Sequence, residues 1–315
     1  HEKSQLIILN SFIKEGSFWI AASINFDKKG NIKKDSTFRG SIIDAKIKFF
    51  NNTFKNINFD FETTRKEQKY YLNNSNFIYK NIKFNSNSIE IDNYKNNFIF
   101  KGDLRNETSA IKSNLIKNLF KDKLNFIEDQ IFQIKTENEF NFKLDKNKIK
   151  DLKVSSNINL EKLKLNLKSK LINKYIKNYK NLLILNNNII NVTYEKDKFN
   201  INGKNNYSLE NLEDKISYQI VKNKNKYNFN ISADLDKSEL FVKYLSYEKK
   251  KNDPANIEII GKYQKDENIG FEKIIFNNGK NHFEVKNLNL TKDYKFQYLD
   301  NAKLKFINLN KKNNQ

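Results

Sequence analysis

Apolar and polar side chains alternate along most of this chain. Residues 18 to 26 show the pattern clearly, with an apolar residue at every even position from Phe18 to Phe26. Similar runs occupy residues 43–49, 57–61, 140–144, 152–160, 163–167, 190–194, 227–235 and 257–263. Because successive side chains of a β-strand point to opposite faces, each run predicts a strand with one apolar and one polar face.

Short polar stretches, such as Lys28-Lys29-Gly30-Asn31, separate these runs and are typical of hairpin turns. About fifteen strands are expected, each paired with its sequence neighbours. The sequence therefore predicts a mostly β fold: a large curled antiparallel β-sheet, a groove or half-barrel built as a repeating meander, with one or two short helices. We expect residues 1–315 to form one continuous elongated segment of a longer protein, with a seam near 236–254.

Two segments depart from the alternation. From Thr108 the apolar residues are spaced by three to five positions, which predicts a helix over about 108–121 that exits through 124–127. It would cover one end of the sheet or gate an apolar channel. Residues 236–248 fit either a helix, begun by Asp236 and Glu239, or a strand through Leu240 and Val242.

One apolar face repeated over so many strands makes an apolar surface that must be removed from water. A second sheet could cover it, the sheet could close on itself, or the sheet could curl around an apolar ligand. The alternation alone leaves these alternatives open. The longest uninterrupted apolar runs, such as 182–185, are far shorter than the ~18 residues of a membrane-spanning helix.

The formal net charge is +21, but the basic residues are spread along every segment and Lys greatly outnumbers Arg. Nucleic-acid-binding proteins more often cluster basic residues and use Arg to contact phosphates. We therefore expect no nucleic-acid partner. A salt-dependent binder with one Lys-dense face stays a minor alternative.

Residues that carry catalysis are scarce in the sequence. The chain has no Cys and two histidines, His1 and His282, which are far apart. It also lacks the common phosphate-loop, nucleophile-elbow and zinc-protease motifs. The sequence thus predicts a protein that is not an enzyme and has no catalytic residues, metal site or cofactor.

The stretch "LDKSELFVKYLSYEKKKNDPANIEI", residues 235–259, contains the one proline of the chain. It resembles a motif of the AsmA-like proteins, specifically the large YhdP-type branch, although Lys250 and Asn252 stand where that family usually has Pro and Gly. The matching residues are Leu235, Asp236, Leu240, Leu245, Tyr247, Lys249, Pro254 and Ala255.

The resemblance implies a bridge-like lipid-transfer or envelope-maintenance segment in the bacterial periplasm. Such a protein would be anchored at the inner membrane outside these residues, and its apolar concave groove would carry phospholipid or another acyl-chain lipid toward the outer membrane. The groove lining would comprise Phe18, Ile20, Ile24, Phe26, Ile47, Phe59, Phe140, Phe142, Val154, Ile158, Phe229 and Ile231. The alternative is a structural or adhesive all-β surface domain in which the same residues fill a closed core.

Overall fold

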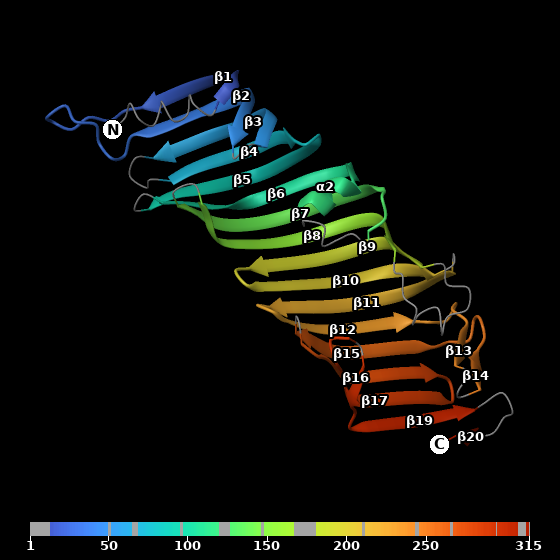
Figure 1. Cartoon of the computed structure of the whole chain (residues 1–315). Helices are drawn as coiled ribbons and strands as arrows, with labels where there is room; N and C mark the ends of the chain where they lie inside the picture. The colour runs from blue at the N-terminus through green and yellow to red at the C-terminus, as the bar shows by residue number, and fades with distance from the viewer. Residues whose placement is uncertain are drawn as a thin grey trace. The chain divides into compact units, whose positions relative to one another are not determined.

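The computed structural model describes residues 13–49, 52–64, 69–94, 97–119, 127–145, 148–166, 181–209, 212–242, 246–264, 267–293, 295–307 and 313–314. Its strands form one antiparallel sheet of 18 strands and a small sheet of two strands (Figure 1). The mostly β antiparallel meander expected from the sequence is therefore confirmed.

Contacts between residues divide the chain into two compact units. Unit 1 comprises His1–Ala110 and Ile134–Ser156, and unit 2 comprises Ile111–Gln133 and Asn157–Gln315. The division falls within strands β6 to β8 and not at residues 236–254. The strands that lie wholly or partly in unit 1 are β1 (Ile13–Ser23), β2 (Thr37–Phe49), β3 (Asn52–Thr64), β4 (Lys69–Tyr79), β5 (Ile82–Tyr94), β6 (Asn97–Lys112), β7 (Ile131–Asp145) and β8 (Lys148–Asn166).

Unit 2 contains the short helix α2 (Ser113–Leu119) and the remaining strands. These strands are β9 (Leu182–Glu195), β10 (Lys198–Leu209), β11 (Leu212–Asn223), β12 (Lys226–Asp234), β13 (Leu240–Val242), β14 (Tyr247–Lys249), β15 (Asn256–Gln264), β16 (Ile269–Asn278), β17 (Asn281–Leu290), β18 (Phe296–Tyr298), β19 (Asn301–Ile307) and β20 (Asn313–Asn314).

Short turns set the strand pairing. Between β4 and β5 the chain reverses through Lys80 and Asn81, whose φ angles are 49° and 66°. Tyr79 and Ile82, which flank them, lie directly opposite each other. Two successive positive φ angles are the mark of a type I′ turn, whose twist matches that of the two strands it joins. Lys80-Asn81 is therefore one of the short polar hairpin turns that the sequence predicted.

A row of β-bulges crosses neighbouring strands of unit 1. Asp44 in β2, Asn56 in β3 and Asn74 in β4 each have a φ angle near 50°, a region that Asn and Asp tolerate better than most residues. The amide of Asn58 completes the row, since its Oδ1 accepts the Asp44 N–H at 3.0 Å and its Nδ2 donates to Asn76 Oδ1 at 3.1 Å.

Each bulge reverses which positions point to the apolar face. In β2 the bulge at Asp44 places Ile42 opposite Phe18, while Ile43 lies opposite Ser17 and is exposed. Beyond the bulge Ala45 is fully buried. The expectation that Ile43 and Ala45 share one regular run was therefore wrong, because the alternation shifts by one position between them.

The predicted helix begins later than expected. Strand β6 continues through Thr108 to Lys112, and α2 occupies only Ser113–Leu119. The backbone of residues 120–126, which include the start of the expected exit, lies outside the described residues. The apolar residues at 111–120 have helical spacing, but the first two residues of this segment still belong to the sixteen-residue strand β6.

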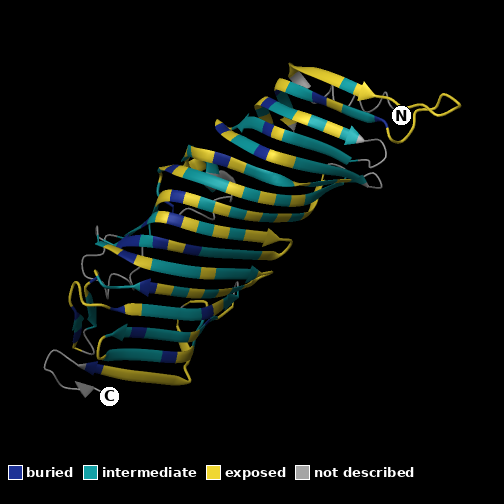
Figure 2. Ribbon diagram, turned by 180° about the vertical axis from the view of Figure 1, so that it is seen from behind, coloured by how far each residue is buried: buried dark blue, intermediate teal, exposed yellow. Residues whose placement is uncertain are grey.

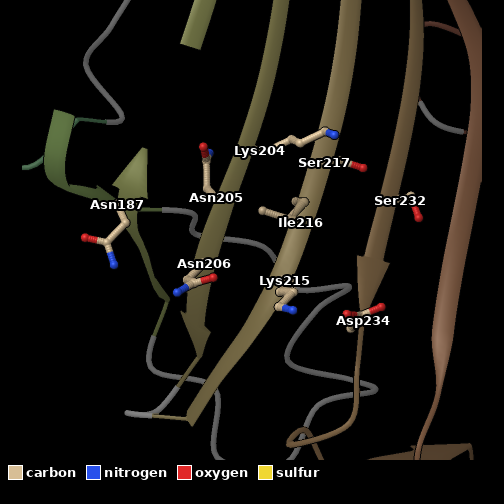
Figure 3. Close-up of a pocket in the computed structure, with 9 residues that line it drawn as sticks. All are labelled: Asn187, Lys204, Asn205, Asn206, Lys215, Ile216, Ser217, Ser232 and Asp234. Atoms are coloured by element: carbon tan, nitrogen blue, oxygen red, sulfur yellow. The ribbon is translucent and has the colours of Figure 1, made fainter. Parts of the chain in front are cut away.

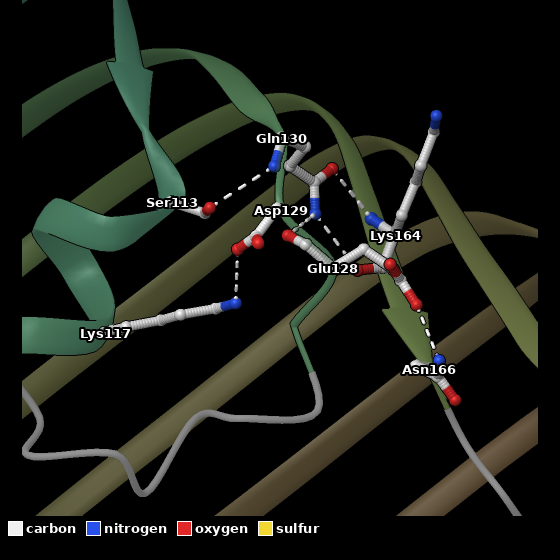
Figure 4. A network of polar contacts seen from close by, with 7 residues as sticks. All are labelled: Ser113, Lys117, Glu128, Asp129, Gln130, Lys164 and Asn166. Atoms are coloured by element: carbon white, nitrogen blue, oxygen red, sulfur yellow. Dashed lines mark hydrogen bonds and ion pairs between the residues drawn. The ribbon is translucent and has the colours of Figure 1, made fainter.

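Polar contacts hold α2 and the segment before β7 to β8, all within unit 2 (Figure 4). Lys117 of α2 forms an ion pair with Asp129 at 2.7 Å, and the Ser113 N–H donates to the Gln130 carbonyl at 2.9 Å. The Gln130 amide then bonds both backbone groups of Lys164, donating to the carbonyl and accepting the N–H at 3.0 Å. The Gln130 side chain thus adds to a backbone contact with β8, in which the Glu128 N–H donates to the Lys164 carbonyl at 3.0 Å.

Residues 235–255 form an excursion from the sheet and not a break in it. Strand β12 pairs directly with β15, from Asp234 opposite Asn256 to Lys226 opposite Gln264. The chain between them folds into the hairpin of β13 and β14, in which Leu240 lies opposite Lys249. The ambiguous residues 240–242 are therefore a strand. The described residues of the predicted seam at 236–254 lie in this excursion, while β12 and β15 stay paired.

Most side chains of the strands are half-buried or exposed (Figure 2). Fully buried apolar residues gather in small clusters, and two of these lie in unit 2. One contains Leu185, Tyr207 and Ala233. The other contains Tyr247, Ala255, Phe276 and Phe306, so the hairpin packs against β16 and β19.

Candidate functional site

The apolar face of unit 2 runs across consecutive strands. Residues directly opposite each other in paired strands lie on the same face of the sheet, so the register defines rows of side chains. One row begins at Ile190 of β9 and ends at Ala302 of β19. In order across the strands it comprises Ile190, Gly203, Tyr218, Ile231, Ile259, Ile274, Val285 and Ala302.

A parallel row lies beside it, and aromatic rings cover its glycine. Its members are Val192, Ile201, Ile220, Phe229, Gly261, Phe271 and Leu288. A Cβ atom at Gly261 would come within 2.7 Å of the Phe229 ring, and one at Gly203 would collide with the Tyr218 ring. The tips of these rings therefore occupy the space that a side chain would fill at each glycine.

The apolar face of unit 1 is built in the same way. Phe18 lies opposite Ile42, which in turn lies opposite Phe59. A second row comprises Ile20, Gly40, Phe61, Leu72, Ile89 and Gly102. Farther along, Phe100 of β6 stacks on Phe142 of β7 with ring centroids 4.8 Å apart.

These faces are only partly shielded from water. Phe18 and Ile20 are 72% and 52% exposed, and Phe229 and Ile231 are half-buried. Within the described part of the chain, the one sheet besides the large one is the hairpin of β13 and β14. Most of the apolar face therefore has no second sheet against it among the described residues.

The structure brings together most, but not all, of the residues predicted to line a groove. Phe18, Ile20 and Phe59 lie on the apolar face of unit 1, and Ile47 lies opposite Phe54 at its far end. Phe229 and Ile231 lie on the face of unit 2. The two phenylalanines of β7, Phe140 and Phe142, lie with ring centroids 5.8 Å apart.

Two predicted residues are placed differently, and two more lie in β8. Ile24 and Phe26 lie beyond the end of β1 at Ser23, where Phe26 forms an isolated bridge with Ile32. They are therefore not part of the strand face. Val154 and Ile158 are half-buried positions of β8 that alternate with exposed residues, and they fall in unit 1 and unit 2 respectively.

Several residues of the face were absent from the prediction. Ile42, Phe61 and Leu72 line the rows of unit 1, and Tyr218 and Ile259 line a row of unit 2. Phe61 follows the alternation of the run that contains Phe59, and the mid-strand Asp44 is the sequence signal that could have located Ile42.

The residues of the family-like motif converge around one buried lysine. The Lys249 side chain is completely buried, and its Nζ donates to the carbonyl oxygens of Asp236 at 3.0 Å, Ser238 at 2.8 Å and Lys250 at 3.0 Å. Burial lowers the pKa of Lys249, while nearby carboxylates, Asp253 foremost, oppose that change. The ammonium uses all three of its donors here, which makes it a structural centre of the excursion.

Other motif residues close the excursion around this lysine. Asp236 Oδ1 accepts the Ala255 N–H at 2.9 Å, and the Leu235 N–H donates to the Ala255 carbonyl at 2.8 Å. Tyr247, only 2% exposed, donates its hydroxyl to Asn278 Oδ1 at 2.8 Å, and burial raises its pKa to about 12. Leu245, also in the predicted motif, lies outside the described residues.

The junction between the sheet and the excursion contains a second buried polar group. Asp214 of β11 accepts the Lys237 N–H with both oxygens, at 3.0 and 3.3 Å. Burial raises the pKa of Asp214 above its ordinary value. Opposite it, the Tyr207 hydroxyl donates to the Asp234 carbonyl, and burial, followed by the charge of Asp214, raises the Tyr207 pKa.

The polar face of unit 2 carries two shallow hollows of about 360 and 490 Å³. They share Lys204, Ser217 and Ser232, and Figure 3 shows the smaller one across β10 to β12. The small serine side chains form the floor between longer amides and lysines. Such a hollow follows from short side chains on a solvated sheet face, and it lies on the face opposite Ile231.

The described residues offer little for other kinds of site. No group of three or more His, Asp and Glu residues among them could hold a metal ion. His282 lies in β17, where its Nδ1 is 2.7 Å from Asn277 Oδ1. In the described part of the chain, no helix combines the length and apolarity that crossing a membrane requires.

Comparisons of the chain with protein-family models, with curated proteins and with solved structures gave no match.

Proposed function

We propose that this chain is a non-enzymatic segment that binds phospholipid acyl chains along its apolar face and transfers them between membranes. The observation that carries the proposal is the rows of aligned apolar side chains, which stay partly exposed across consecutive strands. In the row through Ile231, neighbouring side chains come from strands that pair directly, so an extended chain could follow it from strand to strand.

The energetics favour a long apolar ligand. Each CH₂ group removed from water contributes about 0.8 kcal/mol, so an acyl chain gains most from a surface that contacts it along its whole length. A compact pocket is unnecessary for such a ligand. The residues proposed to contact the chain are the strand-face members of the predicted lining, from Phe18, Ile20 and Phe59 to Phe229 and Ile231.

The cellular setting is part of the proposal. An acyl-chain carrier of this kind would act in the periplasm, held at the inner membrane by an anchor outside residues 1–315, and would serve the maintenance of the outer membrane. This setting rests on the resemblance of residues 235–259 to the AsmA-like motif.

Two variants of neighbouring residues test the proposal. Ile231→Asp places a charge on the apolar face, and Ser232→Asp places the same charge on the polar face of the same strand. After incubation with phosphatidylcholine vesicles, we expect native mass spectrometry to show phospholipid on the unmodified chain and on Ser232→Asp, with several-fold less on Ile231→Asp. Zwitterionic vesicles are needed because a net charge of +21 draws anionic vesicles to any lysine-rich surface.

Circular dichroism of both variants should match that of the unmodified chain. Absence of bound lipid from the unmodified chain would contradict the proposal and favour a structural or adhesive β domain. Equal loss in the two variants would show that the lipid contacts some other surface.

A further inference from the structure

Strand β1 is an edge strand in the described pairing of unit 1. It pairs with β2 from Ser17 opposite Ile43 to Ser23 opposite Thr37, and the described residues provide no strand on its other side. A Cβ atom on Gly40 would collide with the Trp19 carbonyl oxygen, so that carbonyl points toward β2. Since backbone groups alternate along a strand, the N–H and C=O groups of Phe18, Ile20 and Ala22 face away from β2.

From Ser17 to Ser23 this edge lacks the charged residues, prolines and register shifts that normally protect an edge from pairing. The stretch from Gly16 to Phe26 contains no charged residue, and Phe18, Trp19 and Ile20 are 72%, 50% and 52% exposed. By contrast, β19 in unit 2 carries the exposed Lys303 and Lys305 and pairs with β20. Exposed, uncharged apolar edges readily accept another strand.

We propose that β1 pairs with β1 of a second copy of this chain, antiparallel and centred on Ile20. In that register Phe18 lies opposite Ala22, Trp19 opposite Ala21, and Ser17 opposite Ser23 of the other copy. Each bulky side chain therefore meets a small one, and the two Ile20 residues meet at the two-fold axis. The strand is complementary to itself, which a symmetric dimer interface requires.

Charge identifies β1 as the place where two copies meet. Each chain carries a net charge of +21, so most contacts between copies would bring lysines together. Gly16–Phe26 supplies a stretch without that repulsion. Because Phe18 and Ile20 belong to the apolar face, the pairing would also join the apolar faces of the two copies. The proposal stands whether or not the face binds lipid.

The absence of cysteine makes the register testable by cross-linking. In the proposed pair the two Ile20 Cα atoms are about 5.5 Å apart, within the range of a disulfide. We expect Ile20→Cys to form a disulfide dimer under mild oxidation. The control Ser17→Cys should not, because its two copies lie six positions apart in register, or about 20 Å. Equal cross-linking of both variants would overturn the register.

The oligomeric state provides an independent measurement. Sedimentation equilibrium should show a dimer for the unmodified chain that becomes tighter as salt screens the net charge. Ile20→Lys sets two like charges opposite each other and should raise the dimer Kd about tenfold or more. Ile149→Lys, at a β8 site that is 53% exposed, is the matched control and should leave the Kd unchanged. A chain that stays monomeric at high salt would overturn the proposal.

Discussion

The strands β9 to β12 and the excursion at residues 235–255 are stabilised in different ways, although both belong to unit 2. In the strands, apolar side chains such as Ile231 lie in rows and keep part of their surface exposed. In the excursion, Lys249 and Tyr247 are almost completely buried and fully engaged in hydrogen bonds. A repetitive sheet thus distributes its stability over many weak contacts, whereas a departure from it depends on a few specific ones.

The largest effect is expected at Lys249. Lys249→Met keeps most of the side-chain volume but leaves three buried carbonyl oxygens without their donor. Removing a desolvated charge offsets part of that loss, and we expect the free energy that protects the excursion to fall by about 2–4 kcal/mol. Hydrogen exchange of peptides covering residues 235–255 measures this change.

Lys250→Met is the matched control for that experiment. The Lys250 side chain is exposed and only its carbonyl takes part in the cluster, so its replacement should leave exchange unchanged. If Lys249→Met protects the excursion as well as lysine does, apolar packing and not the three hydrogen bonds holds it together.

A smaller effect is expected at Tyr247. Tyr247→Phe removes the hydrogen bond to Asn278 but keeps the ring packed against Phe276 and Phe306, and should cost about 1 kcal/mol. The same change in the strands, Tyr227→Phe at a half-buried position, should stay within about 0.5 kcal/mol. Urea denaturation of both variants compares the two regions directly. Equal losses would remove the distinction between them.

The smallest effect concerns Asp214, where the two regions meet. Because its pKa is raised in the folded state, its contribution to stability is present below the ordinary value of 3.8 and is lost as the pH rises through the folded pKa. Asp214→Asn can still accept the Lys237 N–H but does not titrate. Its stability relative to the unmodified chain should therefore increase between about pH 4 and neutral pH. Urea denaturation at several pH values measures this change. If the prediction is wrong, the difference in unfolding free energy between Asp214→Asn and the unmodified chain will not vary with pH.

The alternation of apolar residues was enough to predict the fold class and many positions of the apolar face. It predicted Phe18, Ile20, Phe229 and Ile231 on strands because these runs have no irregularity. It failed at Ile43, because the bulge at Asp44 shifts the alternation by one position there. It also extended the first run past Ser23 to Phe26, since periodicity gives no signal for where a neighbouring strand stops pairing.

The burial of Lys249 could not be predicted from local sequence. Lys249, Lys250 and Lys251 are adjacent and chemically identical, and only the fold of the hairpin places the first of them among three carbonyl groups. The family resemblance marked Lys249 and Tyr247 without a physical reason. The structure supplies one, because both residues face the interior of the excursion.

The irregularities at Asp44, Asn56 and Asn74 act together as a crease across neighbouring strands. If one strand slipped by one residue, its bulge would no longer align with the bulges of the neighbouring strands. The slip would also turn its apolar side chains to the polar face. A single inserted residue should therefore be tolerated in a turn but not between a crease position and the strand end. In a sheet with so repetitive a sequence, the crease fixes how each of these strands aligns with its neighbours.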